Sequence, residues 1–153
     1  MTILQRLDEL QLVLPPAPKP LGVYVPAVRS GNLVFLSGQL PLVAGKLAAE
    51  YTGKLGDTVT LEQGQAAARQ ATLNALAILH DIAGLDHVRR IVRLTGFISS
   101  APSFTQQPQV LNAASELLGA VLGEVGVHAR LALGAPVLPL DTCIEIELIA
   151  EVE

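Results

Sequence analysis

Apolar residues near the N-terminus recur every three or four positions, which is typical of one face of a helix. Thr2 is a suitable N-cap for this helix. Four prolines between positions 15 and 20 end it and predict a stiff, extended linker. We therefore expect a helical appendage over residues 1–14, a proline-rich linker over residues 15–20 and the main domain over residues 21–153. The helical apolar positions are Ile3, Leu4, Leu7, Leu10 and Leu14.

Alternating or continuous runs of apolar residues predict five strands in the main domain. Ser30, Gly31 and Asn32 are turn residues, so the first two strands are expected to form a hairpin. Pro26 places the first strand at a sheet edge. The segment Pro41–Asp57 predicts a long loop with a functional or interface role. The predicted strands are Val23–Arg29, Leu33–Gln39, Val88–Ser99, Ala129–Ala135 and Cys143–Val152.

The clearest helical segment is Leu61–Ala83, whose leucines and alanines form a broad apolar face. Thr60 and Gln63 match a capping box at its start. Gly84 provides a natural stop at its end. These signals predict both ends of the helix as well as its existence.

A second long helix is predicted over Ser103–Leu122. Pro108 fits the first turn of a helix, so the ordered part is expected to begin near Thr105. After the leading helix, the order strand–strand–helix–strand–helix–strand–strand predicts an α+β domain. In such a domain two helices cover one face of a mixed sheet.

The strand Cys143–Val152 has the most regular alternation. One face is aliphatic, whereas Glu145 and Glu147 share the opposite face. A carboxylate at this place could orient a water molecule or take up a proton, as a general acid–base does. The alternative is that both glutamates are solvated surface charges.

Arg130 is the unusual residue of the strand Ala129–Ala135. We expect the leucines of this strand, Leu131 and Leu133, to point into the core. Arg130 then lies on the opposite face, beside the small residue Ala132. A permanently charged guanidinium with room around it suits a carboxylate held in a bidentate pair. The alternatives are an intersubunit salt bridge and an exposed strand arginine.

Other polar side chains are weaker candidates. Tyr24 is one of two tyrosines and either packs half-buried or presents its hydroxyl to a cavity. Asn112 interrupts the apolar stripe of the second helix and could form a cap or bridge an interface. Ser37 lacks the flanking glycines of a nucleophile elbow. Cys143 has the character of a small buried hydrophobe.

The chain is strongly aliphatic: it is 50% apolar, 3% aromatic and 16% charged, whereas soluble domains carry about 25% charged residues. These values exclude disorder, collagen and coiled coil, and 153 residues fit one domain. Proline, glycine, serine and glutamine break the longest uncharged stretches, so no membrane span is expected. Arg6, Asp8 and Glu9 do not fit a signal peptide, and a single cysteine agrees with a reducing compartment. We therefore expect a cytoplasmic protein.

The net charge of −4 disfavours nucleic acid as a partner. The densest basic cluster consists of Arg89, Arg90 and Arg93, and it fits a solvated strand edge or intersubunit ion pairs better than a phosphate patch. The three histidines and the single cysteine lack the spacing of zinc ligands. We therefore expect no metal site.

Several short segments, taken together in their order and spacing, resemble the RidA (YjgF, or L-PSP endoribonuclease) family. The resemblance extends from about Leu21 to Glu151 and leaves the N-terminal helix and linker outside. It indicates a divergent branch, because Val23 precedes Tyr24 where the family commonly has proline, and Ala132 stands where a cysteine is common. The segments are Leu21–Tyr24, Leu36–Pro41, Val110–Ala113, Ala129–Arg130, Leu138–Pro139 and Ile144–Glu147.

This resemblance implies a chorismate-mutase-like fold and a homotrimer with clefts between the subunits. In the family, the cleft arginine holds the carboxylate of an imine or enamine such as 2-aminoacrylate. Water then attacks the imine carbon and releases ammonia and a 2-oxo acid, without a cofactor. By resemblance, Arg130 is the carboxylate anchor and Glu145 the acid that orients the water. The cleft would be lined or supported by Tyr24, Ser37, Asn112 and Ala132.

An imine is already electrophilic, so a protein need only position it, supply a proton and direct a water molecule. Two alternatives stay open. One is a trimer that binds small carboxylates, such as 2-oxo acids, without turnover. The other is an endoribonuclease or translation inhibitor, which the acidic charge disfavours. A trimer would bury aliphatic surface on the helix-free sheet face, and the isolated monomer would be scarcely populated.

Overall fold

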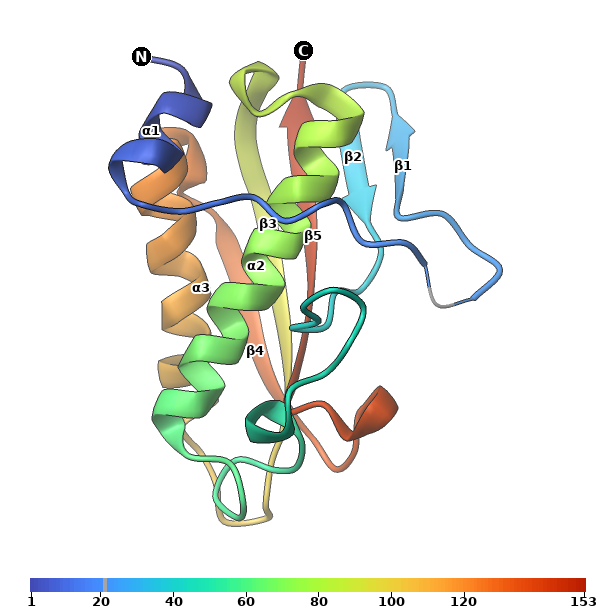
Figure 1. Ribbon diagram of the computed structural model, residues 1–153, viewed down its shortest axis with the longest axis vertical. Helices are drawn as coiled ribbons and strands as arrows, with labels where there is room; N and C mark the ends of the chain where they lie inside the picture. Colours follow the sequence, from blue (N-terminus) through green and yellow to red (C-terminus); the bar gives the residue numbers. More distant parts are fainter. Residues whose placement is uncertain (21) are drawn as a thin grey trace.

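The computed structural model describes residues 1–20 and 22–153, so Leu21, where the resemblance begins, lies outside the described residues. The elements of the main domain are strands β1 (Ala27–Ser30), β2 (Leu33–Leu36), β3 (Val88–Ser99), β4 (Ala129–Ala135) and β5 (Ile144–Val152) and helices α2 (Leu61–Ala83) and α3 (Gln107–Leu122). The strands form one five-stranded sheet in the order β1-β2-β5-β3-β4. Only β3 and β4 pair in parallel within it. Both helices cover the same face (Figure 1), which confirms the predicted α+β layer.

Helix α2 has the ends that its sequence predicts. The Thr60 side chain accepts a hydrogen bond from the Gln63 backbone, and the Gln63 side chain reaches back to the Thr60 N–H. Gly84 ends the helix with a positive φ of 77°, a conformation that costs glycine little. Because alanines dominate its buried face, α2 can approach the sheet closely.

Helix α3 begins at Gln107, later than the predicted start near Ser103 or Thr105. Pro108 occupies its first turn as expected, and the preceding segment forms a separate turn in which the Phe104 N–H donates to the Ala101 carbonyl (3.0 Å). Above the sheet, Leu111 of α3 lies so close to Gly96 of β3 that any side chain at residue 96 would overlap it. α3 therefore packs tightly on β3.

The first hairpin is shorter than predicted. β1 begins at Ala27 and not at Val23, because Pro26 cannot donate a ladder hydrogen bond and the residues before it form bends. β2 ends at Leu36 and not at Gln39, although Gln39 and Ile146 still exchange two backbone hydrogen bonds (2.7 and 3.0 Å). The chain around residues 37–38 therefore leaves the sheet and returns to it.

Helix α1 spans Ile3–Glu9 and is shorter than the predicted appendage, because Gln11 adopts a left-handed conformation (φ 56°) before the prolines are reached. Thr2 caps it as expected. Leu7 is buried in the main core, and the Arg6 Nε donates to the Ala120 carbonyl of α3 (3.0 Å). The linker then crosses in front of α2 toward β1 (Figure 1).

The long loop between β2 and α2 contains the short 3-10 helix η1 (Ala49–Tyr51). The other 3-10 helices are η2 (Leu85–His87), η3 (Gly123–Gly126) and η4 (Pro139–Asp141). The last predicted strand begins at Ile144 and not at Cys143, which is fully buried just before it. None of the helices in the described part of the chain is long and apolar enough to cross a membrane.

The two faces of β4 are the reverse of the prediction. Leu131 and Leu133 are 40% and 42% exposed. Arg130 pairs with Leu94 in the β3–β4 register, and Leu94 is fully buried under the helices. Arg130 and Ala132 therefore point to the helix side, where the Arg130 guanidinium donates hydrogen bonds to α3. The leucines lie on the bare face instead.

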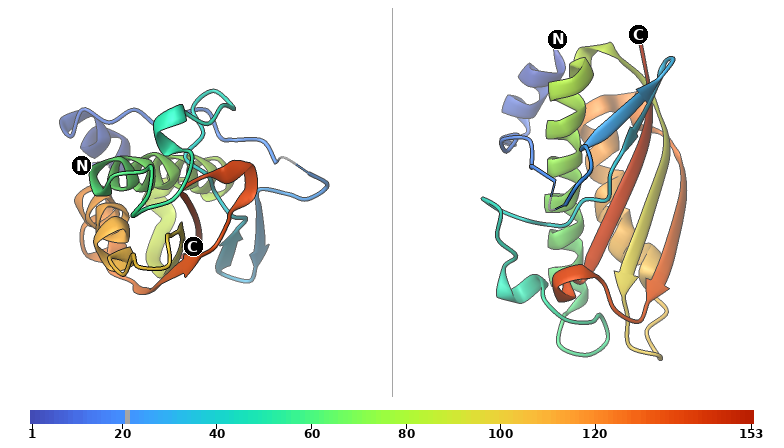
Figure 2. Two further views of the ribbon diagram at one scale, coloured as in Figure 1. Left: turned by 90° about the horizontal axis from the view of Figure 1, so that it is seen from below. Right: turned by 90° about the vertical axis from the view of Figure 1, so that its right-hand side faces the viewer.

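One face of the sheet is not covered by α2 or α3 (Figure 2, right), and exposed apolar side chains lie on it. Cross-strand pairs place Val28 beside Phe35, and Phe35 beside Ile149, in one row. Leu131 and Leu133 of β4 lie on the same face, and Arg93, Thr95 and Glu147 lie between them and this row. We call these five apolar side chains the bare-face patch. Val28, Phe35 and both leucines are each 40–54% exposed, although polar residues also lie on this face.

Candidate functional site

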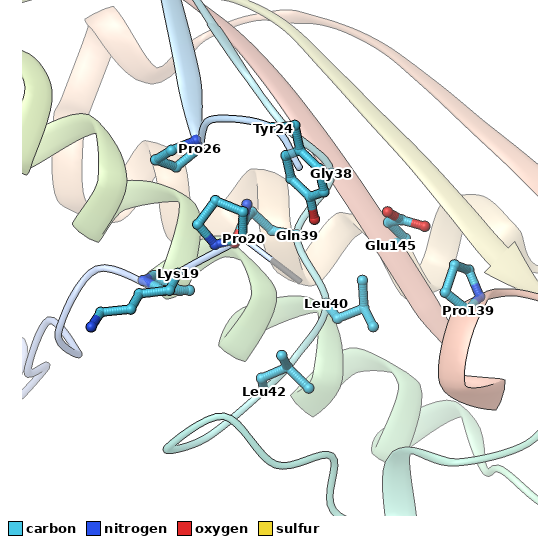
Figure 3. Close-up of a pocket in the computed structure, with 11 residues that line it drawn as sticks. Lys19, Pro20, Tyr24, Pro26, Gly38, Gln39, Leu40, Leu42, Pro139 and Glu145 are labelled. Carbon is cyan, nitrogen blue, oxygen red and sulfur yellow. The ribbon is translucent and has the colours of Figure 1, made fainter. Parts of the chain in front are cut away.

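A cavity of about 150 Å³ lies where β2 ends, between β5 and the proline-rich linker. Glu145 of β5 lines one side of it, and Tyr24 lines another (Figure 3). The remaining wall comes from segments that are far apart in the sequence. These lining residues are Pro18, Lys19, Pro20, Pro26, Gly38, Gln39, Leu40, Leu42 and Pro139.

Glu145 owes its position to the register of the sheet. It follows Ile144 and precedes Ile146, both fully buried under the helices, so its side chain leaves the strand on the other side. There its carboxylate lies directly against the backbone of Gly38. A side chain at residue 38 would collide with the carboxylate, so glycine is required for this approach.

The surroundings of Glu145 shift the pKa of its carboxyl group. Its carboxyl group is half-buried among prolines, leucines and glycine. This burial, with a smaller contribution from the negative charge of Glu147, raises the pKa of Glu145 above its ordinary value. Glu147 itself is exposed. Of the two glutamates that the sequence offers, the structure therefore singles out Glu145 as a group able to hold and release a proton.

Tyr24 and Ser37 are linked through the bend before β1. The Ser37 hydroxyl donates to the Val25 carbonyl (2.6 Å), and the Ser37 N–H donates to the Pro26 carbonyl (2.8 Å). These bonds fix the segment that carries Tyr24, whose ring points into the cavity (Figure 3). Ser37 is not among the lining residues. It acts on the cavity through the position of Tyr24.

Arg130 lies away from this cavity, on the helix side of the edge strand β4. Its Nη1 donates to Ser115 Oγ (3.1 Å) and its Nη2 to the Pro108 carbonyl (3.2 Å), both on α3. Asn112, exposed on the same helix, falls between these two partners in the helical repeat. Among the described residues, no carboxylate forms an ion pair with Arg130. Arg130, Asn112 and the half-buried Ala132 thus form a group separate from Glu145 and Tyr24.

His128 completes the group around Arg130. Its Nδ1 lies 2.6 Å from the Gly126 carbonyl, which can only accept, so Nδ1 carries a hydrogen. In the neutral ring Nε2 then accepts from the Ser115 hydroxyl at 2.9 Å. The Ser115 oxygen still has a lone pair, with which it accepts the hydrogen bond from Arg130. Neither Ser115 nor this use of His128 was predicted, since both depend on the packing of α3 against β4.

Cys143 is unsuited to chemistry in this fold. The side chain is fully buried, and burial raises the pKa of its thiol to about 12. The thiolate, which is the reactive form, is therefore scarce at neutral pH. Within residues 1–20 and 22–153, no group of three or more histidine, cysteine or acidic side chains is placed to hold a metal ion.

The cavity also uses residues that the sequence analysis did not select. Gly38, Gln39 and Pro139 lie inside segments that carry the family resemblance, so their sequence context was a usable signal. The linker residues Lys19 and Pro20 had no such signal, because only the path of the linker across α2 brings them to the cavity.

A mixed sheet with two helices on one face is the architecture of the chorismate-mutase-like α+β proteins. The chain matches over residues 5–152 the family model described as "YjgF/chorismate mutase-like, putative endoribonuclease". The protein therefore belongs to the YjgF family. The match begins within α1, further toward the N-terminus than the segments that carry the resemblance.

Relatives in sequence cover nearly the whole chain. Protein TCP17 of Trypanosoma cruzi is 42% identical over 147 residues, which are 95% of this chain and 91% of the relative. A RutC family protein of Pyrococcus horikoshii is 31% identical over 134 residues, or 88% of this chain and 90% of the relative.

Solved structures divide into two levels of similarity. A Shewanella oneidensis protein superposes with a TM-score of 0.94 at 38% identity, covering 99% of this chain and 100% of the other. The protein Atu1372 of Agrobacterium tumefaciens gives 0.90 at 42% identity, covering 99% and 92%. YjgF of Escherichia coli gives 0.65 at 31% identity, covering 90% and 93%. The first two also match over α1 and the linker, since almost every residue is covered.

Proposed function

We propose that the protein hydrolyses small imines and enamines derived from amino acids, such as 2-aminoacrylate, to 2-oxo acids and ammonia. The observation that carries this proposal is the half-buried carboxyl group of Glu145, with its raised pKa, in the wall of a small cavity. A raised pKa brings a carboxyl group closer to the neutral range in which a general acid–base works best. Membership of the YjgF family supports the same assignment.

The reaction requires little of the protein. An enamine first takes a proton on its β-carbon and becomes an imine. Glu145 accepts a proton from water as the water oxygen bonds to the imine carbon, and returns a proton to the nitrogen. The hydroxyl proton of the resulting carbinolamine then passes to the nitrogen as the carbon–nitrogen bond breaks, which releases ammonia and leaves the 2-oxo acid. No oxidant, reductant or cofactor enters this balance, and Tyr24 is positioned to hold the substrate over Glu145.

We further propose that the carboxylate anchor comes from a neighbouring protomer of a homotrimer. Arg130 and Glu145 leave the sheet on opposite sides of one chain, so they do not meet within it. Arg130 lies on β4, which is an edge strand and is accessible to a second copy. Burial of the bare-face patch would provide the apolar contact that an obligate interface needs.

The test is a coupled assay in which a dehydratase generates 2-aminoacrylate from serine and the release of pyruvate is followed. The purified protein is expected to accelerate pyruvate release over buffer. Glu145→Gln and Arg130→Ala should each remove most of that acceleration, on the scale of about 10²–10⁴-fold for an acid–base group. Matched controls are Glu151→Gln, on the same strand as Glu145, and Arg69→Ala, on the exposed side of α2. Both should retain full acceleration.

No acceleration by the wild-type protein would refute the deaminase, and so would equal acceleration by Arg130→Ala. In the first case, carboxylate binding without turnover is the next candidate, which 2-oxo acids would reveal by raising the melting temperature. Ribonuclease activity ranks below both, because the chain is acidic and Arg89 of the basic cluster is already paired with Glu153. The buried free thiol of Cys143 agrees with a cytoplasmic location, which we propose with the function.

A further inference from the structure

The hydrogen bonds that lead away from Arg130 all run in one direction. Arg130 Nη1 donates to Ser115 Oγ (3.1 Å), and the Ser115 hydroxyl donates to His128 Nε2 (2.9 Å). His128 Nδ1 in turn donates to the Gly126 carbonyl (2.6 Å). Because a carbonyl can only accept, Gly126 sets the direction of every bond before it when the ring is neutral. We call Arg130, Ser115, His128 and the Gly126 carbonyl the relay.

The far end of the relay is fixed by packing. Gly126 is buried in the 3-10 helix η3, and any side chain at residue 126 would collide with the backbone of α3 at Leu118. η3 lies this close to α3 only because residue 126 is glycine. The Gly126 carbonyl is therefore a stationary acceptor, and it determines which nitrogen of the His128 ring carries the hydrogen.

The second hydrogen bond of Arg130 is also made to a fixed group. Arg130 Nη2 donates to the carbonyl of Pro108, in the first turn of α3 (3.2 Å). Gln107 Nε2 ties this turn to the preceding segment, because it donates to the Phe104 carbonyl (2.8 Å) and to Ser100 Oγ (3.2 Å). The guanidinium is therefore held by α3 at both of its Nη atoms.

These two bonds leave part of the guanidinium for a ligand. Nε and both Nη atoms each carry a hydrogen that neither Ser115 nor Pro108 uses. A pair of such hydrogens suits a carboxylate bound in bidentate geometry. Arg130 is only half-buried, and no acidic side chain within residues 1–20 and 22–153 forms an ion pair with it. Its charge is therefore not compensated by a carboxylate of that part of the chain.

We propose that Ser115 and His128 are positioning residues, which orient the Arg130 guanidinium before a carboxylate arrives. The inference rests on the proposed function, in which Arg130 holds the carboxylate of the substrate. A mobile arginine loses conformational entropy each time it binds a ligand, whereas an arginine that is already held loses little and binds more tightly. His128 acts only through Ser115, because it keeps the hydroxyl hydrogen turned away from the guanidinium.

Calorimetric titration of the full-length protein with pyruvate tests this inference. Ser115→Ala and His128→Phe should each weaken binding about 3- to 10-fold, because the ligand must then order Arg130 itself. Both variants break the same relay, so the double variant should bind no more weakly than either single variant. Ser115→Thr keeps the hydroxyl and His128→Gln keeps an acceptor, and both should recover most of the lost affinity. His128→Leu serves if the phenylalanine ring disturbs folding.

The matched controls are Ser103→Ala and His80→Phe, because both residues are exposed and lie outside the relay. Both should bind pyruvate as the wild type does. A second measurement needs no ligand: at a pH at which the ring is neutral, nitrogen NMR should show the hydrogen of His128 on Nδ1. A hydrogen on Nε2 would overturn the inference.

Equal affinity of Ser115→Ala and the wild type for pyruvate would also overturn the inference, and so would losses that multiply in the double variant. Both results would leave the proposed function intact, since Arg130 would still bind the carboxylate. Failure of the wild-type protein to bind pyruvate would overturn the inference and also count against the proposed function.

Discussion

The carboxylate of Glu145 rests on the backbone of Gly38, with no space between them for even a methyl group. This contact joins the central strand to the segment that leaves β2, and it fixes the direction in which the carboxylate points. Activity is therefore expected to depend on a residue that has no functional group of its own.

Gly38→Ala is predicted to displace the Glu145 side chain and lower activity while the fold is kept. Because the added methyl group meets only the flexible Glu145 side chain, which can move aside, the unfolding free energy should fall by less than the roughly 1–3 kcal/mol typical of overpacking in a core. Chemical denaturation and the coupled pyruvate assay measure the two effects. Gly119→Ala is the control: residue 119 lies in α3 with open space around it, so alanine should stabilise the protein by up to about 1 kcal/mol. Full activity in Gly38→Ala would contradict the assigned role of this contact.

Glu145 should also affect how the stability of the protein depends on pH. Because its pKa is raised in the fold, the native state holds a proton that the unfolded chain has already lost, and stability falls as pH rises between the two pKa values. Glu145→Gln removes this loss. The melting temperature of the variant, relative to the wild type, is therefore expected to increase from about pH 4 upward and to level off above the pKa of the folded state.

Glu153 should affect the pH dependence of stability in the opposite direction. A hydrogen bond from His87 and the charge of Arg89 lower the pKa of its carboxyl group. Its contribution to stability is present at neutral pH and is lost as pH falls through the folded pKa. Glu153→Gln should therefore lower the melting temperature slightly at neutral pH and not at strongly acidic pH. Differences of the same sign for both variants would contradict the two assignments.

Cys143 is predicted to resist alkylation in the native protein. It is fully buried and the pKa of its thiol is raised to about 12, so iodoacetamide should modify it only after unfolding. Mass spectrometry across a denaturant series checks this: the modified fraction is expected to follow the unfolding transition. Rapid labelling without denaturant would show that the region before β5 opens locally.

The bare-face patch predicts the oligomeric state. Sedimentation velocity on the wild-type protein should show a trimer with little monomer at micromolar concentrations. Leu131→Glu or Phe35→Glu places a charge in the patch and should shift the population toward monomer. A monomeric wild-type protein would refute the trimer, and with it the proposal that Arg130 of one copy serves Glu145 of another.

The sequence predicted most of the fold where local signals coincide. The ends of α2 and β3 match the predicted residues because caps, periodicity and glycine agree there. The faces of β4 were assigned wrongly because Leu131 and Leu133 have the hydrophobicity of core residues. Exposed apolar surface and buried core look identical in a strand of this kind, and only the register with β3 separates them.

The candidate site was predictable in part. Glu145 and Tyr24 were selected from the sequence and line the same cavity. Arg130 was expected to share a cleft between subunits with Glu145; within one chain the two residues lie on opposite sides of the sheet, so their meeting across subunits stays a prediction. The contribution of the linker could not be predicted, because it depends on where an extended segment crosses a helix and leaves no periodic pattern.

The order of the strands also constrains how the sheet folds. β5 follows the other four strands along the chain, yet it lies in the middle of the sheet and is the only link between β2 and β3. Until β5 is in place, the β1–β2 hairpin and the parallel β3–β4 pair are therefore two separate pieces with open edges. The sheet closes only when residues 144–152 insert between them. Because Glu145 is carried on this same strand, the step that closes the sheet also brings the acid to the cavity.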